Sequence, residues 1–152
     1  MTLSRIGLAF NPTNPAAVEL RERAIAWCKL RGLEVWAEPA GEYERVLARL
    51  PTTDLVVVLG GDGTFLRAAP AVAEIDVPIL GVNLGKVGFL SKVEEHELES
   101  VLAQVAADEY RIDERMMIRA SILPGGRSEP GEQFTALNDV VVARGRLARV
   151  CR

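Results

Sequence analysis

The chain contains little of what marks a metal site, a disulfide framework or a membrane segment. Cysteine occurs twice and histidine once among 152 residues, and the spacing of Cys28 and Cys151 predicts neither a metal site nor a disulfide. His96 is expected on an exposed helix, without metal-ligating partners. No apolar run approaches the roughly 20 residues of a membrane span, and no signal peptide is expected. We therefore predict a cytoplasmic protein.

Positive charge is also scarce. Lysine occurs only at Lys29, Lys86 and Lys92, and the formal net charge is −3. A protein that binds nucleic acid usually carries a basic surface, which this composition does not provide. We expect neither nucleic acid nor a membrane as a partner. Hydrophobic residues make up 49% of the chain, which is enough for a globular core.

Strand-like and helix-like segments alternate over the first hundred residues. The predicted strands cover residues 6–10, 33–37, 55–59 and 78–82, and the predicted helices cover 16–31, 43–50, 65–73 and 94–107. Segment 55–59 is apolar on both sides, as a parallel strand covered by helices on both faces must be. Residues 1–109 therefore predict an open, mostly parallel, doubly wound (Rossmann-like) α/β domain that binds ligands beyond the carboxyl ends of its strands.

The pattern changes after residue 110. Segments 116–123 and 134–143 have strand character and flank a turn rich in glycine and proline at 124–131. Two such segments predict an antiparallel hairpin. Because a lone hairpin is marginally stable and leaves unpaired edges, residues 110–152 are expected to be the first strands of an incomplete β-rich domain.

The strongest chemical signal is the Gly-Gly-Asp-Gly-Thr segment directly after strand 55–59. Glycine at Gly60, Gly61 and Gly63 lets the backbone fold around a phosphate and point N–H groups at it. The N-terminus of the next helix also favours an anion. A carboxylate repels phosphate, so Asp62 is expected to orient a hydroxyl or accept its proton. The alternative is a strand-to-helix turn in which Asp62 only caps the helix.

Two further segments could bind a ligand. Residues 83–91 contain glycines, a lysine and Phe89, which suit a phosphate and a stacked base; alternatively, Phe89 belongs to the core. Asn138 and Asp139, where a strand is expected to begin, can bind amide and hydroxyl groups, but they are also common turn residues. The Gly-Gly-Asp-Gly-Thr loop at residues 60–64 is neither a P-loop nor the dinucleotide fingerprint Gly-x-Gly-x-x-Gly.

Taken together, the segments GGDGTFLRAAP, PILGVNLGKVGFLS and ALNDVVVARG, in this order and at these separations, resemble the NAD kinase family. The resemblance implies transfer of the γ-phosphoryl group of ATP, or in some members of polyphosphate, to the adenosine 2′-hydroxyl of NAD, which gives NADP. It implies Mg²⁺ as cofactor, held largely by the nucleotide and water. No protein ligand of the metal is assigned. A homodimer or homotetramer is implied for the full-length protein.

Carried over residue by residue, the resemblance makes Asp62 the general base. The residues that it implies to surround NAD or its phosphates are Gly60, Gly61, Asp62, Gly63, Thr64, Arg67, Phe89, Asn138, Asp139 and Arg149. The family continues into a second, β-rich domain with a Gly-Ser-Thr-Ala-type NAD-binding segment, which this sequence lacks. The 152-residue chain is therefore expected to be inactive, or nearly so, by itself.

Two other functions stay open from the residues alone. Lipid kinases of the diacylglycerol and sphingosine type share the Gly-Gly-Asp-Gly-Thr loop, but after the next strand they usually carry Gly-Thr-x-Asn, where this chain has NLGKVGFLS. A non-catalytic nucleotide-binding module is the second alternative. It would gain little from a carboxylate beside phosphates, which counts against it.

Overall fold

The computed structural model describes residues 3–85, 88–123 and 131–142. The chain divides into two compact units, Met1–Asp113 and Glu114–Arg152. Each unit has a sheet of its own, of five strands in the first unit and two in the second.

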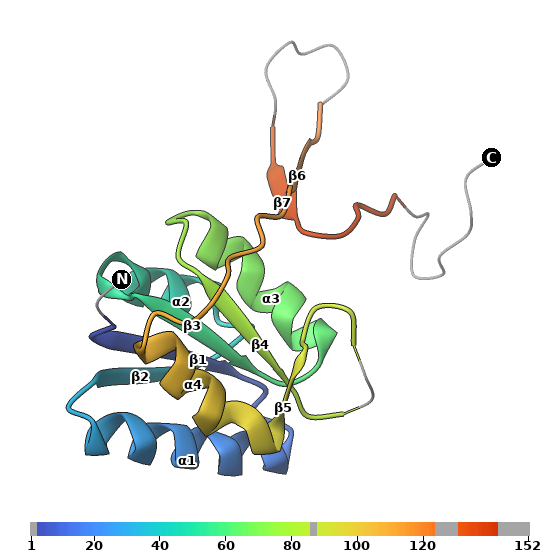
Figure 1. Cartoon of the computed structure of the whole chain (residues 1–152). Coiled ribbons are helices and arrows are strands. Elements are labelled where there is room, and N and C mark those ends of the chain that lie inside the picture. The colour runs from blue at the N-terminus through green and yellow to red at the C-terminus, as the bar shows by residue number, and fades with distance from the viewer. Residues whose placement is uncertain (1–2, 86–87, 124–130, 143–152) are drawn as a thin grey trace. The chain divides into compact units, whose positions relative to one another are not determined.

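The first unit is built on a parallel sheet with the strand order β2-β1-β3-β4-β5 (Figure 1). Its strands are β1 (Arg5–Phe10), β2 (Glu34–Pro39), β3 (Leu55–Leu59), β4 (Ile79–Asn83) and β5 (Val93–Glu94). The central strand β3 pairs in parallel with both β1 and β4. The predicted open, parallel α/β fold is therefore confirmed, and the loops that follow β3 and β4 leave the sheet at the same edge.

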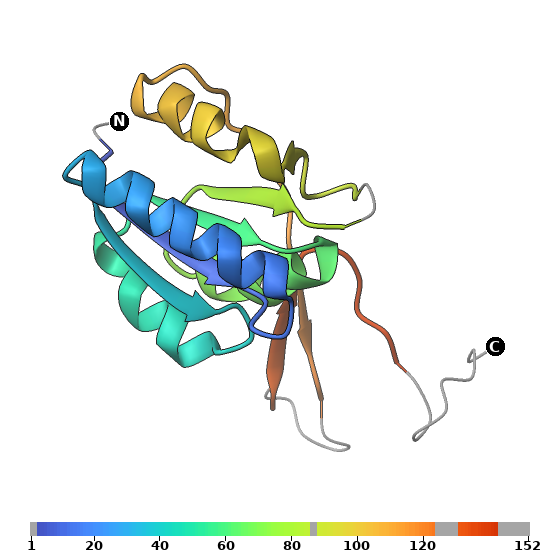
Figure 2. The same cartoon turned by 90° about the horizontal axis from the view of Figure 1, so that it is seen from below.

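Helices cover both faces of this sheet (Figures 1 and 2). Helices α1 (Pro15–Leu30) and α4 (Leu98–Ala106) lie on one face, and α2 (Tyr43–Arg49) and α3 (Asp62–Ala73) lie on the other. The alternate residues Leu55, Val57 and Leu59 of β3 join the core under α1 and α4, while Val56 and Val58 are equally buried toward the opposite face. None of the helices in the described ranges is long and apolar enough to cross a membrane.

The starts of α3 and α4 differ from prediction by more than one residue. Helix α3 begins at Asp62, three residues before the predicted start at residue 65. The start of predicted helix 94–107 is wrong, because Val93–Glu94 pairs with β4 as the short strand β5. A single 3-10 turn, Glu95–Glu97, then precedes α4; the N–H of Glu94 donates to Glu97 Oε2 at 2.9 Å and caps this turn.

The second unit contains the predicted hairpin. Strands β6 (Ile118–Ser121) and β7 (Gln133–Ala136) pair antiparallel, while the turn between them at 124–130 lies outside the described residues. The second predicted strand, 134–143, is too long. Ala136 already pairs with Ile118, the first residue of β6, so within the described part of the chain residues 137–142 have no strand opposite them.

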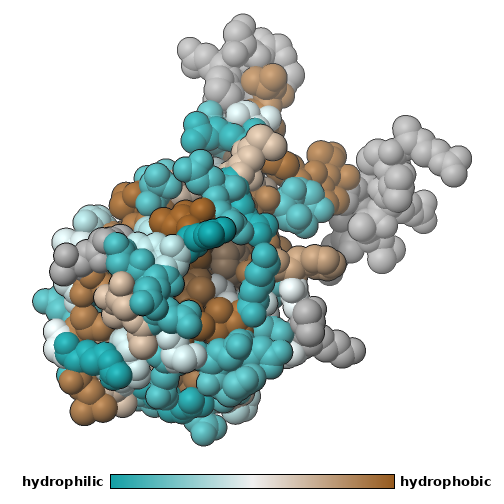
Figure 3. Space-filling view, in the orientation of Figure 1, coloured by the Kyte–Doolittle hydropathy of each residue, from teal (hydrophilic) through white to brown (hydrophobic). Residues whose placement is uncertain are grey.

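One face of this hairpin is apolar. Because side chains alternate along a strand, Ile118 and Ala120 of β6 share a face with Phe134 and Ala136 of β7, and Ile122 extends it. The other face carries polar residues. Ile118, Ile122 and Phe134 expose between 42% and 52% of their surface, and apolar atoms of the second unit are visible in brown in Figure 3. Such a face normally packs against further structure.

Candidate active site

The glycine loop joins the carboxyl end of β3 to α3. All five residues of β3 are buried, and Gly61 is the N-cap residue of the helix, whose carbonyl accepts the N–H groups of Thr64 at 2.9 Å and Phe65 at 3.1 Å. Gly60 is a glycine because a Cβ there would lie 2.7 Å from the Cβ of the buried Thr64. A Cβ at Gly61 or Gly63 would meet nothing within 4 Å, so the outer side of the loop has room for a ligand.

Asp62 binds the loop that follows β4. Its Oδ2 accepts the backbone N–H of Phe89 at 2.9 Å, and its Oδ1 accepts those of Leu90 at 3.1 Å and Ser91 at 3.2 Å. The alternative in which Asp62 is the helix cap is therefore wrong: Gly61 occupies that position, and Asp62 is the first residue of α3. The carboxylate instead joins two loops that lie about 27 residues apart in sequence.

These hydrogen bonds favour the charged form of Asp62. The N–H of Phe89 is the largest cause that lowers the pKa of the carboxyl group; partial burial opposes it, and the N–H groups of Leu90 and Ser91 lower the pKa further. Asp62 is thus a carboxylate at neutral pH. A carboxylate accepts about four hydrogen bonds, two at each oxygen; among the described residues, Oδ1 accepts two N–H groups and Oδ2 accepts one.

Phe89, whose N–H binds Oδ2, is 90% exposed. The alternative that Phe89 belongs to the core is therefore wrong. Its backbone is held by Asp62 while its ring is available to a ligand. An exposed aromatic ring is suited to stacking on a planar base.

Gly88 is a site residue that the sequence reasoning missed. An ideal Cβ at Gly88 would lie 2.8 Å from Cγ of Asp62, closer than two carbon atoms pack. The two glycines of segment 83–91 were visible in the sequence, but nothing in the sequence connected either of them to Asp62.

The other predicted residues lie apart from this contact or outside the described residues. Arg67 is exposed on α3, one turn beyond Asp62. Asn138 and Asp139 belong to the second unit and are exposed just after β7 ends, rather than where a strand begins. Arg149 lies outside the described residues. The structure thus joins the glycine loop and Phe89 within the first unit.

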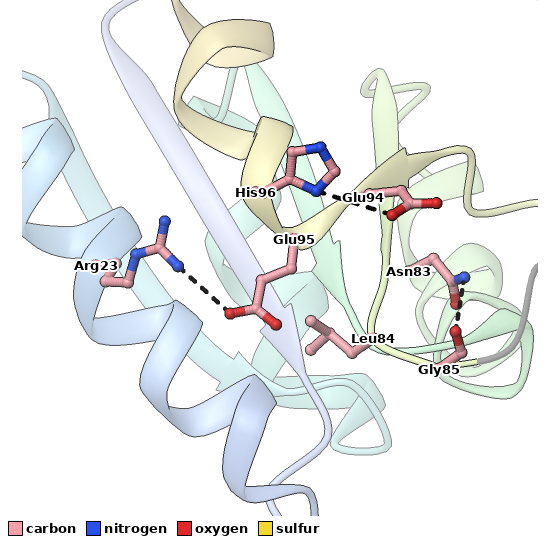
Figure 4. A pocket seen from close by; sticks show the side chains of 7 residues that line it. All are labelled: Arg23, Asn83, Leu84, Gly85, Glu94, Glu95 and His96. Atoms are coloured by element: carbon pink, nitrogen blue, oxygen red, sulfur yellow. Dashed lines mark hydrogen bonds and ion pairs between the residues drawn. The ribbon is translucent and has the colours of Figure 1, made fainter.

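A separate open pocket lies where β4 ends and β5 begins (Figure 4). It has a volume of about 550 Å³ and is lined by Arg23, Asn83, Leu84, Gly85, Glu94, Glu95 and His96. Arg23 pairs with Glu95 at 3.4 Å, and His96 Nδ1 lies 3.8 Å from a carboxylate oxygen of Glu94. The pocket shares residues 83–85 with the predicted ligand-binding segment 83–91, but it contains neither Asp62 nor Phe89.

Cys28 and His96 have the structural roles expected of them. Cys28 is a buried free thiol on α1; burial raises its pKa to about 11, against a smaller opposing effect of Arg31. His96 is exposed. Within residues 3–85, 88–123 and 131–142, no group of three or more His, Cys, Asp or Glu side chains is arranged to hold a metal ion.

Comparison with known proteins identifies the family of this chain. Residues 48–110 match the family model of the ATP-NAD kinase N-terminal domain. An NAD kinase of Dehalococcoides mccartyi is 40% identical over 146 residues, which are 96% of this chain and 51% of the relative. An NAD kinase of Heliobacterium modesticaldum is 38% identical over 97% of this chain and 54% of the relative. The chain therefore spans about half the length of the curated relatives it matches.

The fold also has a counterpart among solved structures. The crystal structure of yeast NADH kinase complexed with NADH superposes with a TM-score of 0.76 over 90% of this chain and 45% of that one, at 21% identity. A parallel sheet covered by helices on both faces, whose central strand leads into a Gly-Gly-Asp-Gly-Thr loop, defines the class of the fold as an open α/β domain. Within that class, the family model and the curated relatives identify one family. The chain belongs to the NAD kinase family and corresponds to its N-terminal portion.

Proposed function

We propose that this chain is the nucleotide-binding part of an NAD kinase that phosphorylates the adenosine 2′-hydroxyl of NAD, with ATP or polyphosphate as donor. The observation that carries the proposal is the contact between Asp62 and Phe89. This contact joins a carboxylate, ionised at neutral pH, to the backbone of a residue whose aromatic ring is exposed. A ribose hydroxyl can donate a hydrogen bond to the carboxylate, and the adenine base attached to that ribose can stack on the ring.

The roles of the residues follow from this placement. Asp62 accepts the hydrogen bond of the 2′-hydroxyl, and Phe89 contacts the adenine. The residues proposed to surround the ribose and the phosphates are Gly60, Gly61, Gly63, Thr64 and Arg67. In the second unit, Asn138 and Asp139 are proposed to bind the NAD amide and hydroxyl groups, and Arg149 is proposed as a further contact.

The reaction breaks two bonds and forms two. The O2′–H bond breaks and its proton passes to Asp62, while O2′ bonds to the γ-phosphorus and the bond from that phosphorus to the bridging oxygen breaks, which releases ADP. The lowered pKa makes Asp62 a weak base. Phosphoryl transfer through a loose transition state depends more on positioning than on base strength. We therefore assign Asp62 chiefly the orientation of the hydroxyl and a late acceptance of its proton.

Magnesium is proposed to enter with ATP. When bound, it would supply charge neutralisation at the donor phosphates, as in other phosphotransferases. The donor set of the site fits a metal bound through the nucleotide, because three backbone N–H groups already bind the Asp62 carboxylate. We also propose a cytoplasmic enzyme that assembles as a homodimer or homotetramer, as the resemblance implies.

A coupled assay of NADP formation tests the function. The 152-residue chain and a version extended by a second domain are each supplied with NAD, ATP and Mg²⁺. We expect activity in the extended protein and none, or nearly none, in the chain alone. Activity of neither protein with NAD, together with turnover of diacylglycerol or sphingosine, would assign the chain to the lipid kinase alternative; nucleotide binding without turnover would assign it to a non-catalytic module.

A further inference from the structure

Gly88 is a glycine for reasons of space and not of backbone conformation. Gly32, which ends α1, has a left-handed φ of 69°, and Gly88 does not share that conformation. The constraint at Gly88 is steric: a Cβ there would clash with the carboxylate of Asp62, at 2.8 Å from its Cγ. Without that side chain, the backbone from residue 88 to residue 91 can close over the carboxylate.

The closed backbone holds the carboxylate from two directions. Oδ1 accepts two N–H groups, from Leu90 and Ser91, and Oδ2 accepts one, from Phe89. Rotation of the carboxylate about its bond to Cβ would misalign all three hydrogen bonds together. Bonds from N–H groups to a charged acceptor are among the stronger ones in proteins, so this arrangement favours one orientation of Asp62.

Burial of the neighbouring residue anchors the loop. Ser91 is 2% exposed, and it packs on β4, where a Cβ at Gly81 would lie 2.9 Å from the Cα of Ser91. One end of the 88–91 segment is thus fixed to the sheet, and α3 carries Asp62. The three hydrogen bonds therefore join α3 to segment 88–91, and both of these elements are positioned by the sheet.

We propose that Gly88, together with the backbone N–H groups of residues 89–91, is the positioning element of Asp62 and orients Oδ2, which accepts one of these three N–H groups, for the substrate hydroxyl. Gly88 is a positioning residue, since it acts through Asp62. The inference rests on the proposed function only in naming that hydroxyl as the 2′-hydroxyl of NAD.

Titration of the Asp62 carboxyl carbon by ¹³C NMR tests the contact without any need for turnover. The full-length protein is compared as wild type, as Gly88→Ala and as Gly41→Ala, a control in which the new Cβ meets nothing within 4 Å. We expect the pKa of Asp62 to lie below the usual aspartate range in the wild type and in the control, and to rise in Gly88→Ala. Asp54, whose pKa is also lowered, reports whether the variant is folded. An unchanged Asp62 titration in a folded Gly88→Ala protein overturns the proposal.

Kinetics supply the second readout. Gly88→Ala is expected to lower kcat for NADP formation by about 10- to 100-fold, the order of loss caused by a small misplacement of a catalytic group, while Gly41→Ala stays within about twofold. If wild type forms no NADP, the proposed function fails, and the titration still decides the role of Gly88.

A double-mutant cycle keeps the test valid if Gly88→Ala folds poorly. Asp62→Ala removes the carboxylate that a Cβ at residue 88 would meet, so Gly88→Ala is expected to cost stability in the wild-type background and little in the Asp62→Ala background. An equal cost of Gly88→Ala in both backgrounds contradicts the proposal.

Discussion

The N–H of Phe89 donates to Oδ2 of Asp62 at 2.9 Å, so an ionised carboxylate holds the backbone of a residue whose aromatic ring is exposed. These two residues come from different loops, after β4 and after β3. The parallel order of these neighbouring strands brings their carboxyl ends together. A ligand that combines a planar base with a hydroxyl can therefore use both residues in one binding event.

Replacement of Phe89 should separate binding from stability. Because the ring is 90% exposed, Phe89→Ala should change the free energy of unfolding by less than about 0.5 kcal/mol. Loss of stacking on a base is worth about 1–3 kcal/mol, so the Kd of the full-length protein for NAD should rise roughly tenfold. Calorimetric titration with NAD measures the effect, and Phe89→Trp is the control that keeps a stacking face. Unchanged affinity in Phe89→Ala would remove the ring from the adenosine site.

Low pH should lower the free energy of unfolding of the first unit, because Asp54 becomes protonated. Partial burial raises the pKa of this carboxyl, but the hydroxyl and N–H of Ser4 and the N–H of Arg5 together lower it below its usual range. A lowered folded-state pKa stabilises the fold above the unfolded-state pKa, and this stabilisation is lost as pH falls through the folded-state value.

The test of this pH dependence is the variant Asp54→Asn. At neutral pH it should lose about 1 kcal/mol of unfolding free energy, because the charged acceptor is gone. Its stability should also fall less steeply toward low pH than that of the wild type. Urea unfolding between neutral and acidic pH measures both effects. If the free energy of unfolding fell equally steeply with pH in the two proteins, this role of Asp54 would be contradicted.

Gly7 of β1 should tolerate no side chain. The indole of Trp36 on β2 lies over it, and a Cβ at Gly7 would be 2.8 Å from Cη2 of the ring, while Nε1 is tied to Thr53 Oγ1 at 2.9 Å. Because the ring cannot move without loss of that buried hydrogen bond, Gly7→Ala should destabilise the protein by about 1–3 kcal/mol. Thermal unfolding measures the change against Gly41→Ala, and equal melting temperatures of the two variants would show that the ring moves freely.

The apolar face of the hairpin should be covered in the extended protein. Ile118, Ile122 and Phe134 expose between 42% and 52% of their surface in this chain. The 152-residue chain should therefore bind a hydrophobic dye, and the amide protons of β6 and β7 should exchange faster in it than in the extended protein. Strong protection of these amides in a proven monomer of the chain would contradict the expected incomplete second domain.

The parts of the fold that depend on local pattern could be predicted from the sequence. Strand β3 was expected with its observed bounds because apolar residues fill both faces, and the end of α1 follows from the left-handed glycine Gly32. Strand β5 was missed because it has two residues, Val93 and Glu94, and forms only by pairing with β4. Nothing local distinguishes those residues from the start of a helix.

In the site, too, only the features with a local sequence signal could be predicted. The importance of Asp62 was visible because a carboxylate among glycines is unusual beside a phosphate. Its partners were not visible, since they are backbone N–H groups, which every residue except proline carries. The role of Gly88 depends on a contact across the sheet edge, and no sequence pattern records the distance between two loops.

The measurement that tests the central claim most directly is ³¹P NMR of the product formed by the full-length protein from NAD, ATP and Mg²⁺, with wild type compared with Asp62→Asn. We predict a phosphate monoester on the adenosine 2′-oxygen with the wild type and at least about a 100-fold slower appearance of it with Asp62→Asn. Formation of the 2′-phosphate at equal rates by both proteins, or its absence with the wild type, would contradict the role assigned to Asp62 and its loop.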